Sequence, residues 1–83
     1  MTLTKLIDHL LETGLSLEIS HDSQDVIFRF RVKESGTLLG CIRSIHKKYL
    51  DRRESLEYKE HLIEETIESG FHEFQLYKEK QNK

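Results

Sequence analysis

The sequence predicts one small α+β domain with the order helix, strand, strand, strand, helix, in which both helices pack on one face of a three-stranded antiparallel sheet. Three observations predict this fold. Apolar residues recur at helical spacing over positions 3–11, alternate with polar residues between positions 15 and 33, and return to helical spacing from about residue 55 to residue 77. With 83 residues, of which 36% are hydrophobic, we expect a single domain over 1–83 and one core.

The first helix is predicted from an apolar stripe with the i, i+3, i+4, i+7, i+8 spacing of an amphipathic helix. The stripe consists of Leu3, Leu6, Ile7, Leu10 and Leu11. Thr2 or Thr4 can cap the first turn, because a threonine hydroxyl accepts a hydrogen bond from a free backbone N–H there. Gly14 lies where a left-handed glycine would end the helix.

Two strands are predicted next, because Leu15–Ser20 and Val26–Lys33 both alternate with period two. The polar segment His21–Asp25 forms the turn between them. The second strand should place its phenylalanines inward and its cations outward. Glu34–Thr37 has the residue types of a tight hairpin loop, so the two strands should be followed by a third.

Residues 38–50 leave two alternatives. One is a helix, because four apolar residues have helical spacing: Leu38, Ile42, Ile45 and Tyr49. The other is a strand, because the preceding hairpin loop requires the chain to return along its neighbour. Gly40 lowers helix propensity by roughly 1 kcal/mol relative to alanine, so we expect a third strand over about 37–46.

A long C-terminal helix is predicted over about 55–77, with Ser55 as its cap. Gly70 is expected to bend or split it, and the polar residues 78–83 are expected to fray. Its apolar face consists of Leu56, Ile63, Ile67, Phe71 and Phe74. The predicted core joins one sheet face, formed by Leu15, Leu17, Ile19, Phe28, Phe30 and Val32, to the helical residues Leu6, Ile7, Leu10, Ile63 and Ile67.

Formal charge is unevenly distributed along the chain, although its net value is only -2. Residues 1–28 carry one lysine against five acids, residues 29–53 carry eight cations against two acids, and residues 54–83 carry four lysines against eight glutamates. The middle segment therefore has a net charge of +6 between two segments of −4 each. This balance is typical of a globular chain and not of a disordered tail.

The predicted second strand places three cations on the outward side of the sheet, because residues two apart point the same way. The cations expected on or near this face are Arg29, Arg31, Lys33, Arg43, Lys47 and Lys48. Such a face can bind an acidic protein or a phosphate backbone, or it can be a solvated surface that discourages sheet aggregation. A nucleic acid is the less favoured partner, because single-strand binding uses exposed aromatic residues beside the cations, whereas Phe28 and Phe30 are expected to point the other way.

The predicted C-terminal helix has more apolar side chains than one narrow stripe needs, and part of this surplus is expected to form a partner or homodimer interface. Large aromatic residues often dominate the binding energy of interfaces. The candidates are Tyr49, Tyr58, Phe74 and Tyr77.

The sequence contains no recognisable catalytic or cofactor-binding constellation, so we expect no enzyme, cofactor or metal site. His61 lies one turn from both Glu57 and Glu65, but such pairs arise freely in glutamate-rich helices. The one cysteine, Cys41, is expected to be a small hydrophobe in a strand. A single cysteine and the absence of a long apolar run favour a cytoplasmic protein outside the membrane.

The first 45 residues resemble the opening layout of small accessory proteins encoded by phages and prophages of Gram-positive bacteria. The resemblance rests on the helix Leu3–Leu11, the stop at Gly14, the strands Leu15–Ile19 and Val26–Lys33, and the turn His21–Asp25. That set includes anti-CRISPR proteins that inhibit a CRISPR nuclease by occupying its DNA-binding surface. It implies a protein that binds and blocks another protein without catalysis or cofactor. The basic segment 29–53 departs from the dense negative surface of the DNA-mimicking members.

The leading hypothesis is therefore a non-catalytic protein–protein interaction module, encoded by a phage, that binds and blocks or modulates a host protein. The alternative is a nucleic-acid-binding accessory protein that uses the basic segment 29–53. A minor third hypothesis is an enzyme subunit whose site a partner completes.

Overall fold

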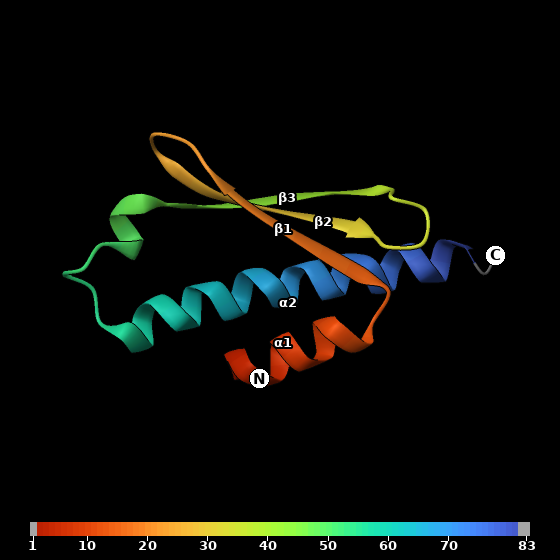
Figure 1. Ribbon diagram of the computed structural model, residues 1–83, viewed down its shortest axis with the longest axis horizontal. Helices are drawn as coiled ribbons and strands as arrows, with labels where there is room; N and C mark the ends of the chain where they lie inside the picture. The colour runs from red at the N-terminus through yellow and green to blue at the C-terminus, as the bar shows by residue number, and fades with distance from the viewer. Residues whose placement is uncertain (1, 82–83) are drawn as a thin grey trace.

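Figure 1 shows a three-stranded sheet and two helices that lie on the same side of it. The computed structural model describes residues 2–81, without the side chains of residues 40 and 41. In chain order the elements are α1 (Leu3–Glu12), β1 (Leu15–His21), β2 (Asp25–Val32), β3 (Leu38–His46), the 3₁₀ helix η1 (Lys47–Leu50) and α2 (Leu56–Gln81). The strands are antiparallel in the order β1-β2-β3, which confirms the predicted α+β class and the helix, three strands, helix order.

The first helix, α1, begins at one of the two predicted caps but ends differently from the prediction. Thr2 has an extended backbone, and its hydroxyl accepts a hydrogen bond from the Lys5 N–H at 3.4 Å. Gly14 does not have a positive φ, so the predicted left-handed stop is wrong. The chain leaves the helix through Thr13, which is extended and whose N–H donates to the carbonyl of His9 at 3.0 Å.

β1 and β2 form a regular antiparallel ladder from the pair 15/32 to the pair 21/26. The carboxylate of Asp22 closes the turn between them, because its Oδ1 accepts hydrogen bonds from the N–H groups of Gln24 and Asp25, both at 2.8 Å. The turn is tight. β2 keeps the predicted alternation of burial over residues 27–32, whereas β1 is exposed on both faces from residue 18 onward.

β3 is the returning strand that the hairpin loop predicted. In that loop Gly36 has φ 72°, a left-handed conformation that a side chain would strain. The pairing of β2 with β3 is less regular than that of β1 with β2, because Arg29 lies opposite Ile42 while Arg31 lies opposite Leu38. Residues 39–41 of β3 therefore bulge opposite residue 30 of β2.

The second helix, α2, is capped as predicted, since the Ser55 hydroxyl accepts a hydrogen bond from the Tyr58 N–H at 3.1 Å. The helix continues to Gln81, beyond the predicted end at 77 and into the segment expected to fray. Residues 82 and 83 of that segment lie outside the described residues. Gly70 does not split α2, which is one continuous helix.

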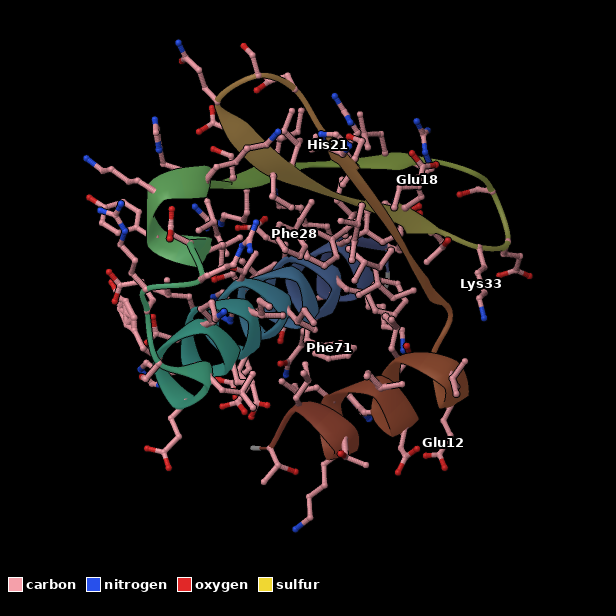
Figure 2. The ribbon with its side chains drawn as sticks, turned by 60° about the vertical axis from the view of Figure 1, so that its left-hand side comes forward. Glu12, Glu18, His21, Phe28, Lys33 and Phe71 are labelled. Carbon is pink, nitrogen blue, oxygen red and sulfur yellow. The ribbon has the colours of Figure 1, made fainter. Side chains whose placement is uncertain are left out.

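The core lies between the helices and the face of the sheet that they cover. Figure 2 shows Phe28 between the sheet and α2, and Glu18 on the opposite side of the sheet. Leu10, Leu17 and Ile63 pack partly buried at its margin. The buried apolar residues are Leu6, Leu15, Phe28, Phe30, Val32, Leu39, Ile45, Ile67 and Phe74.

Two residues that were predicted to be in the core are exposed, Ile19 at 61% and Ile7 at 46%. β1 separates from α1 on the way to the 22–24 turn, which leaves Ile19 uncovered although it points to the helix-covered side (Figure 1). Ile7 lies on one flank of α1. On the other flank, His9 packs against Phe71 of α2 with ring centres 4.6 Å apart.

The helix and sheet layers approach each other closely at Gly70 of α2 and Phe30 of β2. Gly70 is buried, and a Cβ atom on it would overlap the ring of Phe30. Phe30 itself is 0% exposed. The missing Cβ of Gly70 therefore allows the helix to pack closely on the sheet.

Replacing Gly70 by alanine tests this contact. In an exposed helix the change Gly→Ala stabilises by about 1 kcal/mol, whereas overpacking a core costs typically 1–3 kcal/mol. We expect Gly70→Ala to lower the free energy of unfolding, measured by denaturant titration. In the Phe30→Leu background the same substitution should cost less, because the smaller side chain leaves room. A stabilising Gly70→Ala in the wild-type background would contradict the packing described.

Candidate partner-binding surface

One face of the sheet is left uncovered, because α1 and α2 both lie on the other (Figure 1). In β2 the buried residues are 28, 30 and 32, so residues 27, 29 and 31 point away from the helices. The pairing register then assigns their neighbours on β1 and β3. We call this surface the outer sheet face; it consists of Ser16, Glu18, Ser20, Ile27, Arg29, Arg31, Leu38, Ile42 and Ser44.

Arg29 and Arg31 lie at the centre of the outer sheet face and point outward, as predicted. Arg29 donates from Nη1 to the Ser20 hydroxyl at 2.8 Å, and Arg31 donates from Nε to Oε1 of Glu18, also at 2.8 Å. The side chains of this ion pair are 38% and 51% exposed, so water screens the attraction. The pair therefore orients Arg31 more than it stabilises the fold.

The next two predicted cations differ in position. Lys33 is exposed just past the end of β2, and its N–H donates to the carbonyl of Gly14 at 2.8 Å. Arg43 does not join the outer sheet face, because it pairs opposite Phe28 and so belongs to the helix-covered side of β3. It remains exposed there, at the free edge of the sheet.

The last predicted cations lie at one end of the sheet, on η1. The Lys47 N–H donates to the Gln24 carbonyl at 2.8 Å, and its Nζ is 3.2 Å from Nδ1 of His21, so η1 is attached to the 22–24 turn. The Lys48 ammonium lies 5.0 Å from the centre of the Tyr49 ring, within cation–π range. The basic segment is thus spread over the sheet centre, one edge and one end.

The aromatic candidates on α2 do not belong to the outer sheet face. Phe74 is only 6% exposed and is part of the core, so the expectation that it is free to bind a partner is wrong. It lies on the stripe of α2 that faces the sheet. Tyr77 packs partly buried beside the core, and Tyr58 is 37% exposed near the start of α2.

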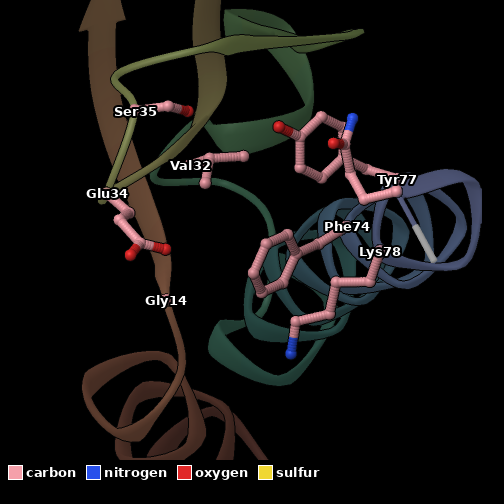
Figure 3. Close-up of a pocket in the computed structure, with 8 residues that line it drawn as sticks. Gly14, Val32, Glu34, Ser35, Phe74, Tyr77 and Lys78 are labelled. Atoms are coloured by element: carbon pink, nitrogen blue, oxygen red, sulfur yellow. The ribbon is translucent and has the colours of Figure 1, made fainter.

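A cleft of about 610 Å³ opens where the end of α2 passes the loop between β2 and β3 (Figure 3). Phe74 forms part of its wall, and the Lys78 ammonium lies 4.8 Å from the centre of that ring. The Ser35 hydroxyl in the lining is 2.7 Å from Oγ1 of Thr37. Among the described lining residues there is no histidine or cysteine, so the cleft does not pair a nucleophile with an imidazole base.

The possible metal ligands noted in the sequence do not assemble. His61 and Glu65 form an exposed ion pair on α2, with Nε2 and Oε1 2.9 Å apart. Within residues 2–81, no three histidine, cysteine, aspartate or glutamate side chains gather so as to hold a metal ion. The side chain of Cys41 lies outside what the structure describes.

Within residues 2–81, no helix is both long and apolar enough to cross a membrane.

Comparison of the chain with protein-family models, with curated proteins and with solved structures found no match. The resemblance to phage accessory proteins therefore stays a prediction.

Two apolar residues of the outer sheet face were missed in the sequence, Leu38 and Ile42. They are 40% and 54% exposed, and they lie opposite Arg31 and Arg29. Their spacing in the sequence suggested a helical stripe, and only the pairing of β3 with β2 shows that they stand beside the arginines. The outer sheet face therefore combines central cations with an apolar margin.

The turn at the η1 end of the sheet contains a perturbed carboxylate. Hydrogen bonds from the N–H groups of Asp25 and Gln24 hold the pKa of Asp22 below its ordinary value of 3.8. The charges of Lys47 and His21 lower it further, by smaller amounts.

The lowered pKa of Asp22 predicts how the free energy of unfolding depends on pH. Because the pKa of Asp22 is lower in the folded state, its carboxylate stabilises the fold at pH values above the ordinary pKa. This stabilisation is lost as the pH falls through the folded pKa. NMR titration of the Asp22 carboxyl should give a midpoint below 3.8. The difference in unfolding free energy between wild type and Asp22→Ala should shrink between about pH 5 and pH 2. A midpoint above the ordinary value would contradict the hydrogen bonds described.

Proposed function

We propose that this protein is a non-catalytic interaction module that binds an acidic partner protein through its outer sheet face. The observation that supports this most is the uncovered sheet, which presents two arginines beside exposed leucine and isoleucine side chains. Interface cores combine apolar side chains with arginine, and arginine is among the residues that contribute most to binding.

The two arginines retain free hydrogen-bonding capacity. A guanidinium has five N–H donors in a planar fork. Arg31 uses Nε for Glu18 and a long contact of 3.4 Å from Nη1 to the Gly36 carbonyl, and Arg29 uses Nη1 for Ser20. The remaining donors can engage a carboxylate of the partner in a bidentate pair, which is the strong form of this interaction.

The apolar margin strengthens such a pair. Ile42 and Leu38 border the arginines on the β3 side. A partner that covers these side chains removes apolar surface from water and also excludes water from the arginine–carboxylate pairs. A cationic centre with an apolar margin thus fits a protein surface that has acidic and apolar residues together.

The same features argue against nucleic acid as the partner. Phe28 and Phe30 are 2% and 0% exposed, and none of the residues of the outer sheet face is aromatic, so bases have nothing to stack on at this face. Tyr49, which is 42% exposed beside Lys48, lies on η1 at the end of the sheet. Glu18 places a negative charge beside Arg31. The other cations of the basic segment, such as Arg43, are directed elsewhere.

Catalysis is not part of the proposal, and neither is a cofactor. Covering a partner's surface is sufficient for the blocking role that the resemblance implies. We further propose that the protein blocks or modulates its partner, that a phage encodes it and that it is located in the cytoplasm.

Affinity capture with matched arginine variants tests the proposed surface. The tagged wild-type protein and Arg29→Ser/Arg31→Ser are used as baits in the same host lysate. We expect a partner of the wild type to bind the variant about thirtyfold more weakly, because an interface arginine can contribute about 2 kcal/mol. Arg52→Ser/Arg53→Ser is the control, since it removes two exposed arginines outside the outer sheet face and should leave binding unchanged.

Glu18→Gln should tighten binding, because it frees Arg31 without changing the shape of the surface. The proposal is contradicted if the sheet variant and the wild type retain the same proteins, or if the wild type retains none. A mobility shift of a single-stranded oligonucleotide at ~50 mM salt that disappears in Arg29→Ser/Arg31→Ser would favour the nucleic-acid alternative instead.

A further inference from the structure

The two edges of the sheet differ in whether they can accept another strand. On β3 the register shifts between residues 38 and 42, and Arg43 belongs to the helix-covered side. A bulge and an inward-pointing charge are two ways in which proteins block strand addition at an edge. β1 has no bulge, because its register is regular throughout, and its helix-covered row, Leu15, Leu17, Ile19 and His21, contains no lysine, arginine, aspartate or glutamate.

Backbone hydrogen-bonding groups of β1 point outward at this free edge. The Lys33 N–H donates to the Gly14 carbonyl at 2.8 Å, and the Asp22 N–H donates to the Asp25 carbonyl at 3.0 Å. Both pairs continue the register of β1 with β2, so the even-numbered residues of β1 are those that bond to β2. The N–H and C=O groups of Leu17 and Ile19 consequently face away from β2.

Exposed apolar side chains lie on β1 itself and on α1. Leu11 is 71% exposed, Ile19 is 61% exposed and Ile7 is 46% exposed. Ile7 and Leu11 lie one turn apart on α1, on the flank opposite to the one where His9 packs against Phe71 of α2. That flank of α1 faces away from α2. It therefore lies toward the edge of the sheet that β1 forms.

We propose that this chain forms a twofold homodimer in which β1 pairs antiparallel with β1 of a second copy, centred on Leu17, to give a continuous six-stranded sheet. In this register Leu17 lies opposite the second copy's Leu17, and Leu15 lies opposite its Ile19. On the outer side, Ser16 lies opposite its Glu18. All the apolar residues of the helix-covered row of β1 then meet apolar residues.

Neighbouring registers are less favourable. Centring the twofold axis on Glu18 places two glutamates directly opposite each other, and like charges at such positions destabilise a strand pair. Centring it on Ile19 places Leu17 opposite His21 and leaves Leu15 opposite Ser23, which lies beyond the strand. Of the registers centred on Leu17, Glu18 and Ile19, the one centred on Leu17 is therefore the most favourable.

A second copy fits this surface better than a free peptide does. A single added strand would satisfy the backbone of β1 but would leave Ile7 and Leu11 uncovered below it. The second copy brings its own α1 at the same distance beneath its own β1, so the two helices meet under the seam through these residues. The outer sheet faces of both copies stay open, and the dimer does not depend on the proposed function.

Solution mass and matched lysine variants test the dimer. We expect light scattering to give twice the 9.9 kDa chain mass for the wild type at high protein concentration. Leu11→Lys and Ile19→Lys should each weaken dimerisation about tenfold or more, because they bury a lysine without a partner at the seam. Leu56→Lys replaces an equally exposed residue, at 68%, at the start of α2 and should dimerise like the wild type. Circular dichroism of each variant verifies that the fold is kept.

NMR on a mixture of labelled and unlabelled chains tests the register. Ser16 and the second copy's Glu18 form a non-hydrogen-bonded pair in the proposed register, where Cα atoms are about 4.5 Å apart and the Hα atoms are close. We expect an intermolecular Hα–Hα contact between these two residues, and slower exchange of the Leu17 and Ile19 amides as the concentration rises. A monomeric wild type, a dimer unaffected by both seam lysines, or a dimer without this contact would each overturn the proposal.

Discussion

The packing of Phe30 on Gly70 determines how the rest of the molecule is arranged. Phe30 belongs to the central strand and is fully buried, and the missing Cβ of Gly70 allows α2 to lie directly against its ring. Because alternate residues of a strand point to opposite faces, fixing Phe30 toward the helix also fixes Arg29 and Arg31 toward solvent. The outer sheet face is therefore a consequence of this one contact in the core.

Local patterns in the sequence were sufficient for the two α-helices and the three strands, but not for the 3₁₀ helix η1 or for the contacts between elements. Period two in 26–33 gave the central strand, and Ser55 gave the start of α2. The role of Gly70 could not be inferred locally, because its Cβ would overlap an aromatic ring from another element, Phe30 of β2. Ile19 was placed in the core by its alternation, yet burial also requires a helix beneath the strand, and β1 rises away from α1.

The sequence predicted the residues of the outer sheet face whose orientation follows from one strand alone. It did not predict the residues whose orientation depends on how two strands pair. Arg29 and Arg31 follow from alternation alone. Arg43, Leu38 and Ile42 could only be assigned once the register of β3 against β2 was known, because a bulge interrupts it. The free edge of β1 is likewise invisible in the sequence, since which backbone groups it exposes is decided by its neighbour.

The uneven distribution of charge along the chain becomes a separation in space. The segment with net charge +6 contributes β3, η1 and the second half of β2, whereas most of the acids lie on the helices and on β1. A molecule built in this way has a permanent dipole moment even though its net charge is close to zero. In the field of an acidic protein it experiences a torque that turns β2 and β3 toward that protein before contact, and dissolved salt weakens this torque over a Debye length of roughly 8 Å at physiological ionic strength.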